Sequence, residues 1–452
     1  MARDAHDLTQ RPAHVLRDAL ASGVLDAEDL ADACLTVIDQ RESEIGAWHY
    51  LDQAHVRAQA QALDRWRKSG KPIGPLHGLP VGIKDIIDVH GMPTENGTPL
   101  CAGQRPRRDA WLVARLKAAG ALIMGKTVTT ELAVLRPAGT RNPHDPARTP
   151  GGSSSGSAAA VAAGMVPLAI GSQTNGSVIR PASFCGVVGY KPSFGLVPRT
   201  GVLTQSPSLD HIGVFARALQ DVALIGDVII GDDAGDPVTR PRPSLQLDMT
   251  AASAPPLPPR FGLWPSSAAD LAEAPVRLGL EELNQALGAR CTLITLPERF
   301  AQIWSWHRAI MLADLAVSFA PLEARDATQL SRTLRAMLED GRSTSATAYI
   351  EAERARPPVL AMLDEVFAAC DALIVPAVRG EAPLGLGSTG DPVFCTPWTY
   401  LGLPALTLPL LQGDNGMPIG VQLVGRFEDD GRLLRTANWL VRVLRGEGRS
   451  DA

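Results

Sequence analysis

The sequence has no pair of cysteines spaced for a metal site or for a dense disulfide framework. Its six cysteines lie at least 25 residues apart and form no C-x-x-C motif, so neither a zinc site nor a small secreted scaffold is indicated. Blocks of like charge are also absent. With 43 Lys and Arg against 48 Asp and Glu, the net charge is -5, which does not favour nucleic acid as a partner.

Long hydrophobic runs are absent too. The longest weakly polar run, residues 158–170, is too short to cross a membrane and contains Pro167. The first residues carry no apolar core of a signal peptide. We therefore expect a cytoplasmic protein without a membrane partner. Hydrophobic residues make up 45% and charged residues 20% of the 452 positions, which is typical of a globular chain.

Composition and periodicity divide the chain into five segments. Residues 1–70 carry apolar residues at helical spacing and form a helical N-terminal lead-in. Residues 71–232 alternate short apolar runs with helical stretches, which is typical of an α/β core. The Pro-rich residues 233–265 predict a surface connection, residues 266–370 a helical cap, and residues 371–452 a part with two late strands that rejoins the core sheet. We expect a single compact α/β domain, with a mixed twisted central sheet flanked by helices.

Residues 120–127, Gly-Ala-Leu-Ile-Met-Gly-Lys-Thr, match the P-loop pattern of nucleotide-binding proteins. A P-loop follows a strand, whereas here a helix is expected before Gly120 and a buried strand after it. The N–H groups of such a strand are bonded within the sheet and cannot hold phosphate. A P-loop nucleotide-binding protein is therefore kept only as an alternative from another class.

A Gly/Ser-rich loop, residues 152–156, matches the nucleophile-elbow pattern G-x-S-x-G with Ser154 at its centre. An elbow follows a core strand, but a polar Pro-rich loop precedes this one, so the elbow is not favoured. A flexible linker is the simplest interpretation. However, Ser153 and Ser154 lead directly into an Ala-rich helix, where free N–H groups are available for binding.

Two further polar residues follow apolar strands. Ser177 comes directly after the turn-forming pair Asn175-Gly176, which would place its hydroxyl beside unpaired N–H groups, as an oxyanion hole requires. Lys84 ends an apolar run, where burial would favour the neutral amine and make it a candidate base. An ordinary pairing of Lys84 with Asp85 is the simpler alternative.

Taken together, these segments resemble the amidase signature family of serine amidohydrolases. The likeness covers residues 70–220 densely and returns at 371–376, 402–409 and 420–425. By this resemblance, Ser177 is the nucleophile, Ser153 bridges by hydrogen bonds and Lys84 is the general base. Such a site hydrolyses carbon–nitrogen acyl bonds through an acyl-enzyme, without a metal or a cofactor. A base of this kind is needed because a serine hydroxyl is a weak nucleophile at neutral pH.

The resemblance also implies the surroundings of this triad. The peptide bond before the bridging Ser153 is expected to be cis, and Ser154 to have a supporting hydrogen-bond role. The oxyanion hole is expected on the backbone N–H groups of the turn, which are those of Thr174, Asn175, Gly176 and Ser177.

Other nucleophile and base combinations remain as alternatives. His77, His90 and His211 lie near the motifs and could serve in a Ser-His-Asp triad, although each stands in an ordinary structural position. Cys185, eight residues after Ser177, is expected to be a core residue.

The segment around Ser177 departs from the commoner family pattern Asp-Thr-Gly-Gly-Ser-Ile-Arg. Asn175 stands where glycine is usual, and Arg180 follows Ser177 by three residues instead of two. On a helix this shift rotates the arginine by ~100°, so that Arg180 either braces the loop, which is favoured, or recognises a carboxylate. Both departures count against the glutamine-hydrolysing subunit of an amidotransferase, which remains an alternative.

Aromatic residues suggest the nature of the substrate. Trp304, Trp306 and Met311 lie on an expected cap helix, and Phe394 and Trp398 in a late loop. The resemblance implies that Ala133, Val134 and Leu135 also contribute to substrate specificity. We expect small apolar or aryl amides, with carbamates and esters as further substrates because their carbonyls pass through the same oxyanion.

Two alternatives to this substrate class remain open. The first is an amidase for a small anionic half-amide that Arg180 recognises. The second is a non-catalytic assembly subunit, although a chain that keeps Lys84, Ser153 and Ser177 together argues against it. The sequence leaves open whether the chain forms a homo-oligomer.

Overall fold

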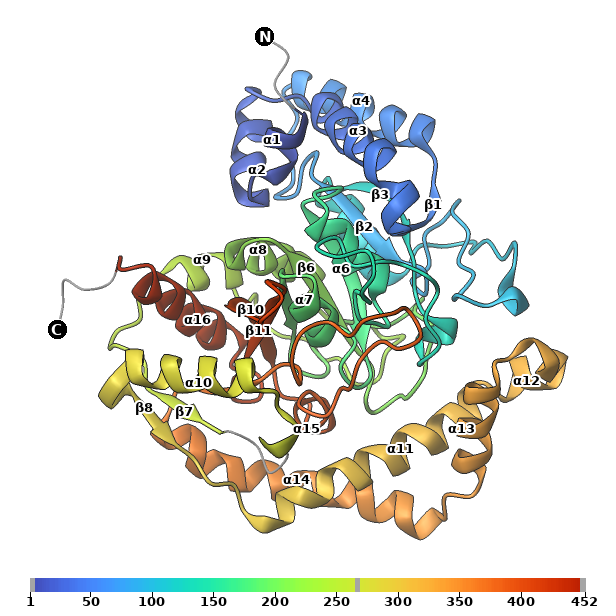
Figure 1. Cartoon of the computed structure of the whole chain (residues 1–452). Coiled ribbons are helices and arrows are strands. Elements are labelled where there is room, and N and C mark those ends of the chain that lie inside the picture. Colours follow the sequence, from blue (N-terminus) through green and yellow to red (C-terminus); the bar gives the residue numbers. More distant parts are fainter. Residues whose placement is uncertain (1–4, 265–268, 448–452) are drawn as a thin grey trace.

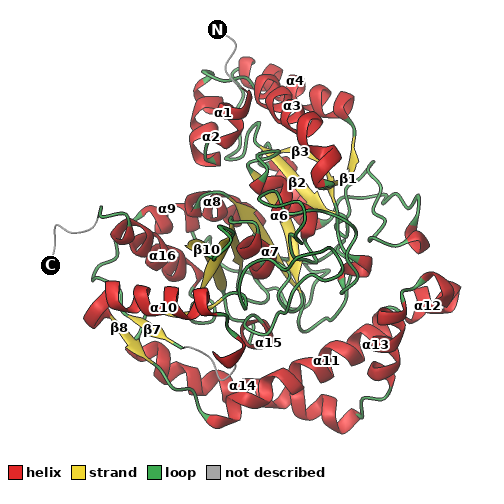
Figure 2. Ribbon diagram, viewed as in Figure 1, coloured by secondary structure: helices red, strands yellow, loops and turns green. Residues whose placement is uncertain are grey.

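A twisted sheet of eleven strands runs through the part of the chain that this computed structural model describes, residues 5–264 and 269–447 (Figures 1 and 2). From one edge to the other the strands are β1 (Trp48–Leu51), β3 (Leu122–Thr127), β2 (Pro80–Lys84), β4 (Leu168–Gln173), β6 (His211–Ala216), β5 (Val188–Lys191), β10 (Ala405–Gln412), β11 (Pro418–Val424), β9 (Ala372–Pro376), β7 (Phe261–Leu263) and β8 (Cys291–Leu293). β2 is parallel to β3 and β4, whereas β4 is antiparallel to β6. The sheet is therefore mixed, as the sequence predicts.

Helices cover this sheet on both faces (Figure 2). In chain order they are α1 (Ala5–Gln10), α2 (Ala13–Ser22), α3 (Ala27–Ile45), α4 (Gln53–Lys68), α5 (Trp111–Ala118), α6 (Ser155–Ala162), α7 (Ile179–Phe184), α8 (Leu219–Ile229), α9 (Leu247–Ala252), α10 (Ala274–Leu287), α11 (Ile303–Ser318), α12 (Ala320–Asp326), α13 (Arg332–Arg342), α14 (Ala346–Ala369), α15 (Thr396–Tyr400) and α16 (Asp430–Leu444). In Figure 1, α1 to α4 lie at one end of the molecule and α11 to α14 along the opposite side.

The strands that carry the candidate site are fully buried. Every residue of β2, β3 and β4 is buried, as expected for near-continuous apolar runs with helices on both faces. β2 and β4 are parallel neighbours, with Ile83 opposite Ile170. Their carboxyl ends therefore lie side by side at the same end of the two strands, which brings Lys84 close to the residues that follow Ile170.

The C-terminal strands belong to the same sheet as the first ones. β10 pairs with β5 through Leu406 and Tyr190, and β11 continues the sheet to β9. α11 packs on α13, α14 and α15, and buried residues of α11 and α14 share one hydrophobic cluster with residues of β9, β10 and β11. The expected boundary between residues 265 and 266 lies outside the described residues.

The P-loop interpretation is wrong. Gly125 and Lys126 lie inside strand β3, and the Lys126 amino group is buried and pairs with Asp85 at 3.1 Å. It also donates hydrogen bonds to the Pro93 carbonyl and the Thr94 hydroxyl. Because Asp85 is thus the partner of Lys126, the simpler alternative of a Lys84–Asp85 pair is wrong as well.

None of the helices in the described ranges combines the length and the apolar character that a membrane span requires.

Candidate active site

Lys84 is the centre of a buried cluster of serine hydroxyls. Its Nζ atom lies 2.8 Å from Ser153 Oγ, 3.0 Å from Ser154 Oγ and 2.9 Å from Ser172 Oγ. Lys84 comes from the end of β2, Ser172 from β4, and the other two serines from the loop that enters α6. Each hydroxyl can both donate and accept a hydrogen bond, so a proton can pass from one member of the cluster to the next.

The environment of the Lys84 amine favours its neutral form. The side chain is fully buried, and no carboxylate among the described residues is within hydrogen-bond or ion-pair distance of its Nζ atom. Burial holds the pKa of Lys84 well below its usual range, and the charge of Asp210 offsets this only in part. Desolvation penalises the ammonium form because the site offers it little compensating charge.

Ser154 orients this cluster through the backbone of β4. Its hydroxyl donates to the Ser172 carbonyl at 3.2 Å and accepts from the Ser172 N–H at 3.2 Å. The single hydroxyl proton of Ser154 is thereby committed, so Ser154 accepts a hydrogen bond from Lys84. The peptide bond between Gly152 and Ser153 is cis, as the family resemblance implies.

Ser177 lies just before α7, after the turn at Asn175-Gly176. Its side chain is only partly buried, unlike those of Ser153 and Ser154. Within the described residues its hydroxyl forms no hydrogen bond, so the structure does not join Ser177 directly to Ser153. Catalytic hydrogen bonds are often long without substrate and shorten in the Michaelis complex.

Backbone N–H groups beside Ser177 are available to a ligand. Across the described ranges, no acceptor bonds the N–H of Asn175, Gly176 or Ser177. The next two N–H groups, those of Val178 and Ile179, instead donate hydrogen bonds to the Gln173 side-chain oxygen at 2.8 and 3.0 Å. The free donors are thus confined to the turn itself, where an oxyanion hole is expected.

The carbonyls of the same turn all have partners. The Thr174 carbonyl is 2.9 Å from His307 Nε2, the Asn175 carbonyl accepts from the Thr399 hydroxyl at 2.5 Å, and the Gly176 carbonyl accepts from the Arg180 N–H at 3.0 Å. Three partners from α11, α15 and α7 therefore fix the turn from outside. His307, Thr399 and Ser172 were not identified from the sequence.

The Thr174 hydroxyl has more acceptors than it has protons. It lies 2.6 Å from Asp210 Oδ1 and 2.5 Å from Gln205 Oε1, and Gln205 must present its oxygen because its amide nitrogen donates to the Leu132 carbonyl. All donors are satisfied when Asp210 is protonated and donates a hydrogen bond to the Thr174 hydroxyl, which in turn donates to Gln205. Burial raises the pKa of Asp210 to about 6, although hydrogen bonds, the largest from Thr174, oppose the shift.

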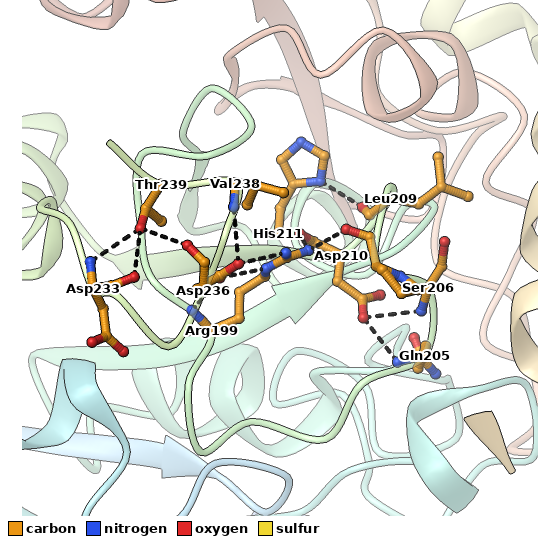
Figure 3. Close-up of polar contacts among 11 residues, drawn as sticks. Arg199, Gln205, Ser206, Leu209, Asp210, His211, Asp233, Asp236, Val238 and Thr239 are labelled. Atoms are coloured by element: carbon orange, nitrogen blue, oxygen red, sulfur yellow. Dashed lines mark hydrogen bonds and ion pairs between the residues drawn. The ribbon is translucent and has the colours of Figure 1, made fainter. Parts of the chain in front are cut away.

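A cavity of about 420 Å³ lies beside Ser172 and Thr174. Figure 3 shows the polar contacts along its wall, where Arg199 forms a forked ion pair with Asp236 and Asp210 accepts from the backbone N–H groups of Gln205 and Ser206. Its lining does not include Ser153 or Ser177. The cavity therefore borders Ser172 of the cluster rather than Ser177.

Arg180 braces the loops around the site. The side chain is 3% exposed, and its Nη2 donates to the Gly152 carbonyl at 2.7 Å and to the Thr389 hydroxyl at 3.2 Å. Burial lowers the pKa of this guanidinium. Of the two roles that the sequence leaves open, these contacts correspond to bracing, while the Nε and Nη1 atoms of Arg180 have no partner among the described residues.

The expected aromatic pocket is partly a core. Trp398 is 0% exposed and packs edge to face with Trp264, so it has no surface for a ligand, and the expectation that it lines the pocket is wrong. Trp306 and Phe394 are also buried. Trp304 is partly exposed, but its indole N–H donates to the Val393 carbonyl at 2.9 Å.

A smaller apolar group remains near the turn. Val134 and Met311 are partly buried and pack in one cluster with Leu203, which also borders the cavity beside Thr174. Ala133 is buried and Leu135 exposed. The structure therefore brings Val134 and Met311 together, and Met311 also packs against the neighbouring cluster that contains Trp398.

The competing nucleophile and base combinations find no support. His77 and His211 are buried and His90 is exposed, and none of the three hydrogen-bonds a serine within the described residues. His211 instead contacts the Leu209 carbonyl at 2.7 Å (Figure 3). Cys185 is buried, its thiol contacts the Pro150 carbonyl, and burial raises its pKa, as for a core residue.

Solved structures with the same fold include amidases. The native peptide amidase from Stenotrophomonas maltophilia superimposes with a TM-score of 0.85 and 29% identity over 96% of this chain and 97% of that one. A structure described as an unexpected vestigial protein complex, which reveals the evolutionary origins of an s-triazine catabolic enzyme, superimposes with a TM-score of 0.90 and 29% identity over 96% and 98%. The protein is an amide-cleaving hydrolase, as predicted.

The chain belongs to the amidase family, whose model matches residues 29–434. Among its relatives is a subunit of the glutamyl-tRNA(Gln) amidotransferase of Chloroflexus aggregans, which is 34% identical over 97% of both chains. The resemblance that the sequence motifs indicate is thereby confirmed, together with the expected fold class.

Proposed function

We propose that the protein hydrolyses carbon–nitrogen acyl bonds through an acyl-enzyme on Ser177, with Ser153 as the proton bridge and Lys84 as the base. The observation that carries the proposal is the Lys84 amine, which is buried, has no carboxylate partner among the described residues and lies 2.8 Å from the Ser153 hydroxyl. A structural lysine in this place would need compensation for its charge. A base needs the neutral form that this environment favours.

Hydrogen-bond counting supports the direction of proton transfer. A neutral amine donates two hydrogen bonds and accepts one, and Lys84 has three hydroxyl neighbours. Ser154 accepts one N–H because its own proton is committed to the Ser172 carbonyl. If Ser172 accepts the second N–H, the lone pair of Lys84 points at the hydroxyl of Ser153, which can then give up its proton.

The proposed reaction follows from this arrangement. Ser177 Oγ attacks the carbonyl carbon while its proton passes to Ser153, which passes its own proton to Lys84. The resulting oxyanion is bound by the free N–H groups of Asn175 and Gly176, with that of Thr174 as a further expected donor. The carbon–nitrogen bond then breaks, and the leaving nitrogen takes the proton back from Lys84 through Ser153. Water attacks the acyl-enzyme by the same route.

The substrate is proposed to be a small uncharged amide with an apolar or aryl group. The contacts of Arg180 Nη2 with Gly152 and Thr389 favour an uncharged substrate, because they assign part of the guanidinium to the loops, while its Nε and Nη1 atoms have no partner among the described residues. The apolar cluster with Val134 and Met311 supports the apolar side. Carbamates and esters remain proposed substrates, since they pass through the same tetrahedral oxyanion.

A second candidate is the glutamine-hydrolysing subunit of an amidotransferase. The observation in its favour is the 34% identity, over 97% of both chains, to the glutamyl-tRNA(Gln) amidotransferase chain of Chloroflexus aggregans. Against it stand Asn175 in place of the glycine of the commoner pattern and Arg180, which follows Ser177 by three residues instead of two. Such a subunit would need partner chains, whereas the first proposal needs none.

The test begins with the nucleophile. Ser177→Ala should fold and lose turnover by several orders of magnitude, as for other deleted nucleophiles, and a fluorophosphonate should label Ser177 in the parent. Ser183→Ala is a matched control, because Ser183 is a buried serine of α7 whose hydroxyl accepts a hydrogen bond from the Gly420 N–H. Turnover that survives in Ser177→Ala would refute the mechanism, and a parent without hydrolytic activity would favour the assembly subunit.

Substrate class is tested in the same assay. Amine or alcohol release should be compared for a neutral aryl amide, an aryl carbamate, an aryl ester, a malonamate-like anion and glutamine. A higher kcat/KM for the neutral aryl compounds supports the first proposal. Preference for the anion that is lost in Arg180→Ala would favour the half-amidase, and preference for glutamine would favour the amidotransferase role.

A further inference from the structure

His307 connects the helical cap to the turn beside Ser177. The residue lies on α11, 133 positions from Thr174, and its Nε2 atom is 2.9 Å from the Thr174 carbonyl oxygen. The imidazole is 1% exposed. It is therefore a fully desolvated polar group in the first turns of α11, and the expected mechanism gives it no role.

The direction of this hydrogen bond is determined by its acceptor. A carbonyl oxygen can only accept, so His307 Nε2 carries the hydrogen and donates it. Burial lowers the pKa of His307 to about 4, and the charge of Arg356 acts in the same direction, although the Thr174 carbonyl opposes both. The ring is neutral at ordinary pH, and its one N–H is the one aimed at Thr174.

The geometry of the peptide group transmits this contact to the other side of the turn. The peptide between Thr174 and Asn175 is planar and trans, so its N–H points away from its carbonyl. When His307 fixes the Thr174 carbonyl, it also fixes the direction of the Asn175 N–H. That N–H has no acceptor among the described residues, which leaves it free for a ligand.

The neighbouring peptide is fixed in the same way from α15. Thr399 donates to the Asn175 carbonyl at 2.5 Å and accepts from the Gln173 side-chain amide at 2.9 Å. The Cys395 carbonyl lies farther from this hydroxyl, at 3.3 Å, so the shorter contact directs its single proton to Asn175 and the Gly176 N–H is turned to the opposite side. Two side chains outside the turn therefore aim two consecutive N–H groups.

We propose that His307 is a positioning residue of the oxyanion hole, which aims the Asn175 N–H by donating its Nε2–H to the Thr174 carbonyl. This inference rests on the proposed function, because it assumes that the oxyanion forms beside Ser177. It gives the helical cap a direct part in catalysis. α11 does not need the imidazole for packing, since Ile303, Ile310 and Leu315 already bury its apolar face.

Three variants separate the donor from the bulk of the side chain. His307→Leu removes the donor, His307→Asn keeps an amide that is too short to reach the carbonyl, and His307→Gln places an amide N–H near the position of Nε2. Ile310→Val is the matched control, because it perturbs the same buried face of α11 without touching a hydrogen bond.

His307→Leu and His307→Asn should lower kcat about tenfold to a hundredfold with little change in KM, which is less than the ~10²–10³ lost when an oxyanion donor is removed outright. His307→Gln should recover most of the loss, and Ile310→Val should resemble the parent. The affinity for a boronic acid that forms a tetrahedral adduct should fall in parallel with kcat/KM. A role in packing alone would lower the Tm without this parallel.

The outcomes distinguish the two proposals. If Ser177→Ala keeps its turnover, the proposed function fails. If Ser177→Ala is inactive but His307→Leu and His307→Asn keep the kcat of Ile310→Val, only the role of His307 is overturned. Equal kcat values for His307→Gln and His307→Asn would overturn it too, and this comparison remains decisive if His307→Leu does not fold.

Discussion

The amino group of Lys84 lies 2.8 Å from the hydroxyl of Ser153, although the two residues are 69 positions apart in the chain. The contact joins the carboxyl end of β2 to the last residues of the loop that enters α6. No carboxylate of the described residues shares it. Within the described residues the Lys84 amino group hydrogen-bonds only to hydroxyls, unlike Lys126, one strand away, which is paired with Asp85.

Activity should fall as the pH drops through the lowered pKa of Lys84. The amine is the active form, and burial lowers its pKa, so it stays neutral above that pKa and gains a proton below it. The pH profile of kcat/KM reports the free enzyme and should show a single loss on the acidic side. Control variants of His211 and His307 should leave this limb where it is. A limb that disappears with either histidine would contradict the assignment.

Lys84→Ala should fold and lose most of its activity. Lys191→Met is the matched control, because Lys191 is also fully buried and its pKa is lowered to about 7 by burial, but its amino group donates to the Leu403 carbonyl, away from the serine cluster. Turnover and Tm of both variants should be measured together. Comparable activity in the two variants would show that the lysine at position 84 is not the base.

Ser172→Ala should lower kcat about fivefold, with little change in KM. Ser172 lies 2.9 Å from Lys84 Nζ and accepts one of its two N–H bonds when the lone pair points at Ser153. A buried hydrogen bond contributes about 1 kcal/mol, which corresponds to roughly a fivefold change in rate. Ser172→Thr keeps the hydroxyl and should retain the activity. If Ser172→Ala matches the parent, another group orients the amine.

Local sequence patterns were sufficient for the central part of the fold. The apolar runs that end at Lys84 and at Met124 predicted β2 and β3, because a short run bounded by turns is typical of a buried strand. Ser154 was expected at the start of a helix, and α6 begins at Ser155. In each case the decisive information lies within about ten residues of sequence.

Elements that depend on distant partners were missed. β1 has only four residues and follows a long helix, and its pairing with β3 is what makes it a strand. His307 reaches Thr174 across 133 positions and Thr399 reaches Asn175 across 224, so no local pattern marks them. Trp398 was misjudged because an aromatic residue in a loop has the same sequence pattern whether it lines a pocket or fills a core.

Arg180→Met should lower the free energy of unfolding by about 1–3 kcal/mol, the range for a buried group that loses its hydrogen-bonded partner. The guanidinium holds the Gly152 carbonyl and Thr389 together, and methionine can hold neither. Turnover of neutral and anionic amides should fall together, because the loop before Ser153 is affected in both cases. Denaturant unfolding and kcat/KM for both substrates provide the measurements, and a loss confined to the anion would instead favour carboxylate recognition.

Asp210→Asn should preserve the hydrogen bonds behind the turn. The Asp210 side chain accepts the Gln205 and Ser206 N–H groups with one oxygen, and its other oxygen must carry a proton for the Thr174 hydroxyl to donate to Gln205. An asparagine with its oxygen toward the two N–H groups supplies the same pattern, with its amide nitrogen as the permanent donor to Thr174. The variant should therefore keep the activity of the parent, whereas Asp210→Ala should lose it.

The stability of Asp210→Asn relative to the parent should depend on pH. Because the folded pKa of Asp210 is raised from 3.8 to about 6, the folded state binds the proton more tightly than the unfolded state. The stability that this proton provides is complete below pH 3.8 and is lost as the pH rises through about 6. The difference corresponds to about 3 kcal/mol at most. Asparagine does not titrate, so denaturant unfolding should show Asp210→Asn gaining up to that amount on the parent between about pH 4 and pH 7. A difference that stays constant with pH would mean that Asp210 is ionised throughout and that Thr174 donates to it.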